Sequence, residues 1–182
     1  MSHSIERLGG LQRRAWGLQR GVSLIELMVT LAVVGILAAV AVPTMTGLID
    51  ANRLTGTSSE LTASLQLARS EAVRRRSSVT ICGSSDGVTC DGDDWSRWVV
   101  RGNESTTGDT VVVQSSGVTS DSVQISGPAG GLVFRSSGLL DGQGQLTVCI
   151  PGESLSDNQR RITVMMSGTV VSEKQSGGGA CP

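Results

Sequence analysis

The side chains that most often perform acid–base, nucleophilic or metal chemistry are sparse in this sequence of 182 residues. Its one histidine, His3, lies near the N-terminus, so the remainder of the chain has no histidine for a catalytic triad or a metal site. Asp91, Asp93 and Asp94 form an acidic run, but they lack the twelve-residue spacing and final glutamate of a calcium loop. A solvated turn is the better interpretation. We therefore expect no catalytic residues, no metal and no cofactor.

Glu26 is an acid inside an apolar run that extends from Val22 to Val42. A helix of about 20 residues crosses the hydrocarbon core of a bilayer, so this run is long enough to span it. An acid within a membrane span is costly and is tolerated when it has a partner. We interpret Glu26 as a functional residue. The alternative is a juxtamembrane glutamate whose carboxylate reaches the lipid headgroups.

Basic residues precede the apolar run and a proline follows it. Four arginines before Gly21 would hold the N-terminus in the cytoplasm and place the C-terminal part outside. An ordinary signal peptide has a shorter apolar core with a cleavage site after it, whereas this basic segment ends in Gly21, before the core. At the far end, Pro43 predicts a kink rather than the end of the helix, because the helical pattern resumes beyond it.

The order of these features resembles the class III leader of type IV pilins and type II secretion pseudopilins. The resemblance rests on a basic leader, Gly21, the sequence VSLIEL, an apolar helix and Pro43. It implies that a prepilin peptidase cuts between Gly21 and Val22 and methylates the new N-terminal amine, although Val22 stands where the family usually has phenylalanine. Such a cut would remove four of the 15 basic residues and one of the 16 acidic residues, changing the net charge from −1 to −4.

Cleavage would also give Glu26 a partner. The new amine of Val22 would lie near Glu26, because residues four apart are neighbours on a helix. The amine of a neighbouring subunit is the more useful partner, since pairing between chains fixes their register during filament assembly. The partners implied are other pilins or pseudopilins, bound through the N-terminal helix, the prepilin peptidase and the inner membrane.

Beyond Pro43, residues 48–76 have apolar side chains near helical spacing. These are Leu54, Leu61, Leu65, Ala68, Ala72 and Val73. A break is possible at residues 56–59, but one continuous helix is the simplest interpretation. The remainder alternates short strand-like runs with turns rich in glycine, serine and aspartate. Strands are expected at 78–82, 97–101, 110–114, 122–126, 131–135, 145–150, 161–166 and 169–172.

The expected fold is α+β and pilin-like. A long N-terminal helix, its first half transmembrane, packs on a C-terminal antiparallel β-sheet head. We predict a leader at 1–21, a transmembrane and assembly helix at 22–43, its amphipathic continuation at 44–76 and a periplasmic head at 77–182. The protein is then a single-pass inner-membrane protein with a cytoplasmic N-terminus, and part of a pilus or pseudopilus after assembly.

All four cysteines follow the apolar run, which favours disulfides in an oxidising compartment. A zinc site is the rival, but the short C-x2-C spacing is missing. Four cysteines allow three pairings. Within the pilins, the head resembles the GspH/FimT group at residues 70–82, 93–100 and 160–171, and this resemblance implies the pairs Cys82–Cys90 and Cys149–Cys181.

Arginines offer the main case for nucleic acid. Arg74, Arg75 and Arg76 suit the C-terminal turn of a helix, or phosphate contacts. Some members of the resembled group bind DNA through a glycine- and arginine-rich stretch near the C-terminus; here that stretch, 167–171, reads SGTVV. The basic residues nearby are Arg160, Arg161 and Lys174. The acidic balance of the cleaved chain argues against DNA binding.

Two tryptophans follow the acidic run. Of Trp95 and Trp98, one is expected in the core and the other over the disulfide loop; two aromatic rings make a thin platform for stacking bases. We predict a non-enzymatic minor pilin or pseudopilin that incorporates into a type IV pilus or a type II secretion pseudopilus and helps to initiate it. The alternative is a DNA-binding minor pilin that acts in DNA uptake.

Overall fold

A computed structural model describes residues 21–92, 94–104 and 107–182. The predicted leader, apart from Gly21, and Asp93 of the acidic run therefore lie outside the described residues. The chain divides into two compact units between Ala41 and Val42. Each unit is described by itself below.

A single helix, α1 (Leu24–Arg75), occupies most of the N-terminal third of the chain. Its start is capped by Ser23, whose hydroxyl accepts a hydrogen bond from the backbone N–H of Glu26 at 3.2 Å. The helix is unbroken at residues 56–59 and does not end at Pro43, as the pattern predicted. Among the described residues, α1 is also the one helix long and apolar enough to cross a membrane.

In the second unit, α1 buries the face that the helical spacing predicted. Leu54, Leu61, Leu65 and Ala68 are fully buried there. Val73 is the exception, with half of its surface exposed. It directly follows the buried Ala72, and one residue corresponds to about 100° of rotation around a helix, so Val73 leaves the buried stripe.

Within the described residues, eight strands follow the helix, one at each predicted position, with ends shifted by a few residues. They form two antiparallel four-stranded sheets, a division that the sequence did not predict. One sheet has the order β3-β2-β1-β5 and the other β4-β6-β7-β8. The bounds are β1 (Val79–Gly83), β2 (Arg97–Asn103), β3 (Thr110–Gly117), β4 (Gln124–Ser126), β5 (Leu132–Phe134), β6 (Gly144–Cys149), β7 (Gln159–Val164) and β8 (Val170–Gln175).

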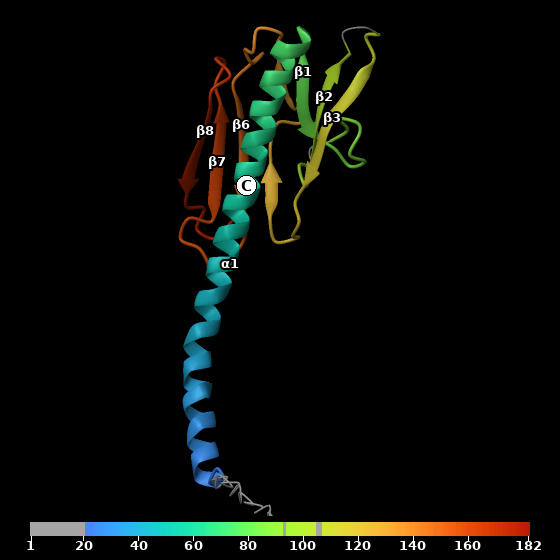
Figure 1. Ribbon diagram of the computed structural model, residues 1–182. Helices are drawn as coiled ribbons and strands as arrows, with labels where there is room; N and C mark the ends of the chain where they lie inside the picture. The colour runs from blue at the N-terminus through green and yellow to red at the C-terminus, as the bar shows by residue number, and fades with distance from the viewer. Residues whose placement is uncertain (1–20, 93, 105–106) are drawn as a thin grey trace, which may run out of the picture. The chain divides into compact units, whose positions relative to one another are not determined.

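The core lies between α1 and the two sheets. In Figure 1 the green part of α1 runs across the sheets, with β6, β7 and β8 to one side and β1, β2 and β3 to the other. Apolar side chains from both sheets join the helix in one cluster, among them Ile81, Val100, Phe134, Leu146 and Ile162. This shared core joins the helix and both sheets into one domain in the second unit.

Both tryptophans belong to the core, so the expectation that only one would enter it was wrong. Trp95 and Trp98 are fully buried. Trp98 donates its indole N–H to the hydroxyl of Ser64 on α1 at 3.0 Å. Trp95 lies against Gly127, where a Cβ atom would come within 2.7 Å of the indole ring. Glycine at 127 thus makes room for the second indole.

Candidate functional site: an exposed helical segment and a cross-linked head

The described residues of the first unit present an apolar surface. Every residue from Val22 to Ala41 is exposed, and Leu24 retains 77% of its accessible surface. Contiguous apolar surface of this extent marks a site of contact with a membrane or with another protein. The structure thus provides a helical surface available for both.

Glu26 lies in the first turn of this segment. A carboxylate is favoured there, because the unpaired N–H groups of the first turn give a helix start a partial positive charge. Gly21 and Val22 precede the helix and are exposed. Among the described residues, a Cβ atom at Gly21 would meet nothing within 4 Å, so packing against them does not require glycine at that position.

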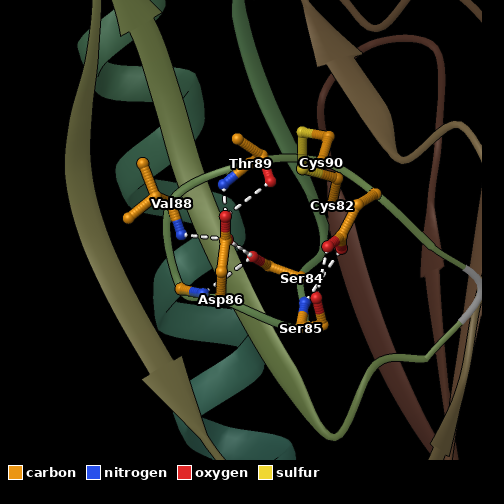
Figure 2. The surroundings of a disulfide bond; sticks show 9 residues. Cys82, Ser84, Ser85, Asp86, Val88, Thr89 and Cys90 are labelled. Carbon is orange, nitrogen blue, oxygen red and sulfur yellow. Dashed lines mark hydrogen bonds between the residues drawn. A yellow bond between two sulfur atoms is a disulfide. The ribbon is translucent and has the colours of Figure 1, made fainter.

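The structure contains both disulfides that the family resemblance implied, Cys82–Cys90 and Cys149–Cys181. The first closes a loop directly after β1, shown in Figure 2. The second ties the C-terminal segment to the end of β6. Both lie in the second unit.

Asp86 organises the loop that Cys82–Cys90 closes. Its carboxylate accepts hydrogen bonds from the backbone N–H groups of Val88 and Thr89, each at 2.7 Å, and from the hydroxyls of Ser84 and Thr89. Figure 2 shows this carboxylate at the centre of the loop. The hydrogen bonds, first those from the backbone N–H groups of Thr89 and Val88, hold the pKa of Asp86 well below its usual range.

This lowered pKa predicts an acid-sensitive loop. A depressed folded-state pKa stabilises the fold above the unfolded pKa of about 3.9, and the contribution is lost as the pH falls toward the folded value. We expect Asp86→Asn to melt at a lower temperature than the wild type at pH 7, with the difference shrinking at pH 3. Thermal unfolding of the full chain in detergent measures both, and the exposed Asp121→Asn is the control. An undiminished difference at pH 3 would show that charge is not the cause.

The C-terminal segment is held by a buried amide as well as by its disulfide. Asn158, fully buried, donates to the carbonyl oxygens of Ile150 and Ala180, each at 3.1 Å, and accepts from the backbone N–H of Gly177 at 2.7 Å. Gln159 donates to Ala180 as well, at 2.9 Å. These contacts fix the last residues of the chain against β6 and β7. Sequence reasoning missed Asn158, because a single polar residue before a strand gives no signal of burial.

The basic residues that were considered as possible DNA contacts fall into two separate groups. Arg74 and Arg75 end α1 and both bond the carboxylate of Glu71, which lowers the pKa of Glu71 to about 2. Arg76 follows with a positive φ of 54°. These contacts match the interpretation of the run as the end of a helix.

The second group lies where β7 begins and β8 ends. Arg160 on β7 is opposite Lys174 on β8, and Arg161 is opposite Glu173. The other end of these strands meets α1, because Arg69 donates to the carbonyl of Gly168 in the β7–β8 turn at 3.1 Å. A six-residue strand spans about 20 Å, so the structure does not bring the two basic groups together.

The acidic run forms local hydrogen bonds. Asp91 accepts from the backbone N–H and the hydroxyl of Ser85, and Asp94 accepts from the N–H of Ser96 at 2.7 Å. Within the described ranges, no group of three or more histidine, cysteine, aspartate or glutamate residues is placed to hold a metal ion.

The family of the type II transport protein GspH has a sequence model that matches residues 57–169 of this chain. The chain belongs to the GspH family. A second match covers residues 16–42 and is the prokaryotic N-terminal methylation motif, which contains Gly21, Val22 and Glu26. Together the matches confirm the predicted placement among minor pilins and pseudopilins of the type IV pilus or type II secretion family.

Solved structures share the fold of this GspH-family chain. The type IV minor pilin FimU of Pseudomonas aeruginosa aligns with a TM-score of 0.54 and 24% identity over 67% of this chain and 89% of FimU. The minor pseudopilin EpsH from the type 2 secretion system of Vibrio cholerae aligns with a TM-score of 0.51 and 17% identity, over 67% of this chain and 97% of EpsH. No curated protein sequence matches the chain. The likenesses confirm the pilin-like fold.

Proposed function

We propose that this chain is a non-enzymatic subunit that enters a type IV pilus or a type II secretion pseudopilus through its N-terminal helix. The observation that carries the proposal is the apolar segment from Val22 to Ala41, in which every residue is exposed, with Glu26 in the first turn of its helix. A membrane would cover this surface before assembly, and neighbouring helices would cover it afterwards. Family membership supports the same role.

Processing and topology belong to the proposal. Cleavage between Gly21 and Val22 would free an amine one helical turn from Glu26. Residues 22–43 would span the inner membrane and residues 77–182 would form a periplasmic head, after the continuation at 44–76. Two disulfides suit an oxidising compartment and support this orientation.

If the peptidase requires glycine before the cut, a substitution at Gly21 should prevent cleavage. Gly21→Val should remain uncut, because the peptidase must accommodate a residue with no side chain at the scissile bond. The uncut chain keeps 21 of the 182 residues of an 18.8 kDa protein, so it should run about 2 kDa heavier on a gel. Gly35→Val is the matched control, since Gly35 also has open space around it. Normal maturation of Gly21→Val would show that the leader assignment is wrong.

The role of a minor subunit that helps to initiate a filament is part of this proposal. FimU is called a minor pilin and EpsH a minor pseudopilin, and the shared fold supports extending that role to this chain. DNA uptake has weaker support. The basic residues form two separate groups, and two members of the first are engaged by Glu71.

A further inference from the structure

A groove lies in the second unit, between α1 and the β7–β8 turn. It has a volume of about 590 Å³. Arg69 and Val73 of α1 line one wall, and Gly168, Thr169 and Val170 line the other. We call it the Arg69 groove.

The guanidinium of Arg69 is oriented by a hydrogen bond to the β7–β8 turn. One guanidinium nitrogen of Arg69 donates to the carbonyl of Gly168 at 3.1 Å. Gly168 has a positive φ of 77°, and a Cβ atom there would come within 2.4 Å of the carbonyl oxygen of Gly138 and within 2.7 Å of Nε of Arg69. Glycine therefore lets the guanidinium lie against the turn. Within the described residues, no carboxylate forms an ion pair with Arg69.

Exposed apolar side chains line the groove or belong to the β7–β8 turn that forms its second wall. Val73 is 50% exposed, Met165 47% and Met166 62%. Leu139, also exposed, belongs to a loop that meets the turn, because the neighbouring Leu140 donates its N–H to the carbonyl of Met166 at 3.0 Å. Methionine side chains adapt to irregular partners and are enriched at protein interfaces. Exposed apolar side chains near a cation without a carboxylate partner fit a ligand that carries both aliphatic groups and an acid.

We propose that the Arg69 groove binds a segment of a neighbouring pilin-like subunit in which a carboxylate is flanked by aliphatic side chains. The carboxylate would pair with Arg69, whose guanidinium is already oriented by Gly168, and the aliphatic groups would cover Val73 and the exposed methionines. Charge-assisted hydrogen bonds of this kind are among the strong ones, and a preformed site loses less entropy on binding. The identity of this partner rests on the function proposed above.

Protein is a better fit to the groove than nucleic acid. DNA affinity grows with the number of phosphates that cations neutralise. Arg69 is the one charged side chain among the residues that line this groove; Val73 and Val170 are apolar, and Gln66, Ser70 and Thr169 are polar and uncharged. Thr169 and Val170 supply no charge from the second wall.

The test uses the full chain in detergent micelles and fluorescence anisotropy. The probe is a short labelled peptide, blocked at both ends, with one glutamate between two leucines; a second peptide has glutamine instead. We expect the glutamate peptide to bind saturably and the glutamine peptide about tenfold more weakly, because a hydrogen bond to a charged acceptor is stronger than one to a neutral amide. Arg69→Gln should weaken only the glutamate peptide, by the same factor.

Further variants separate the groove from the remaining surface. Thr169→Trp, at an exposed position, should block both peptides, and it decides the matter if Arg69→Gln fails to fold by circular dichroism. Val73→Ser should weaken both peptides, whereas Val112→Ser, which alters an exposed valine on β3, should weaken neither.

Three outcomes would overturn the inference: no saturable binding, equal affinity for the two peptides, or unaltered binding to Thr169→Trp. Binding of a short DNA duplex that Arg69→Gln abolishes would also overturn it, in favour of a nucleic-acid site. None of these results bears on incorporation through Glu26, so failure of the groove and failure of the proposed function are distinguishable.

Discussion

Glu26→Ala should insert into the membrane and be cut after Gly21 like the wild type, yet its recovery in filaments should fall at least about tenfold. Insertion should be unharmed because removal of a charge from a span lowers its cost. Incorporation should fail because the subunit no longer offers a carboxylate to the N-terminal amine of a neighbour. The measurement is the amount of this protein in sheared filaments, divided by its membrane pool.

Two further variants sharpen this test. Glu26→Gln keeps the size and hydrogen bonding of the side chain and removes its charge, so recovery with glutamine would indicate packing instead of ion pairing. Glu60→Ala removes an exposed acid from the same helix beyond the apolar segment and should assemble normally. Equal recovery of Glu26→Ala and wild type would mean that the glutamate only reaches the headgroups.

Trp98→Ala should destabilise the second unit by about 3–5 kcal/mol, the usual cost of removing a large aromatic side chain from a core. Trp98 is fully buried between β2 and α1, and its indole N–H is paired with the hydroxyl of Ser64. Ser64→Ala should cost about 1–3 kcal/mol, because it leaves that N–H buried without its acceptor. Chemical unfolding followed by near-ultraviolet circular dichroism measures both losses.

The replacement Trp98→Phe provides the control for the hydrogen bond. It retains much of the buried ring and removes the donor, so Ser64→Ala should cost less in the phenylalanine background than in the wild type. Equal costs in the two backgrounds would contradict the pairing. A loss below about 1 kcal/mol for Trp98→Ala would contradict its place in the core.

Local periodicity explains why the elements were predictable from sequence. The apolar positions of α1 recur at helical spacing, and turns rich in glycine and serine separate the strands. The assignment of Val73 to the buried stripe was wrong because helical spacing has a tolerance of about one residue, and the true stripe ends at Ala72. The division into two sheets depends on which strands pair across long stretches of chain, and single-strand patterns carry no such information.

The candidate site residues also divide into those that a local sequence pattern reveals and those that only the fold reveals. The roles proposed for Gly21, Val22 and Glu26 come from a short motif in which the order of the residues alone is informative. The disulfide pairs came from family resemblance, because four cysteines leave three pairings open. Ser64, Asp86 and Asn158 were missed, because a polar side chain gains its role from partners that only the fold brings near.

The proposed function depends on one claim, that this chain is cut after Gly21 and enters a filament with its apolar helix attached. The most direct test is the intact mass of the protein recovered from sheared and purified filaments. We predict the mass of residues 22–182 with one added methyl group and two disulfides. A chain found only in the membrane fraction, or one cut after the apolar helix, would contradict the claim.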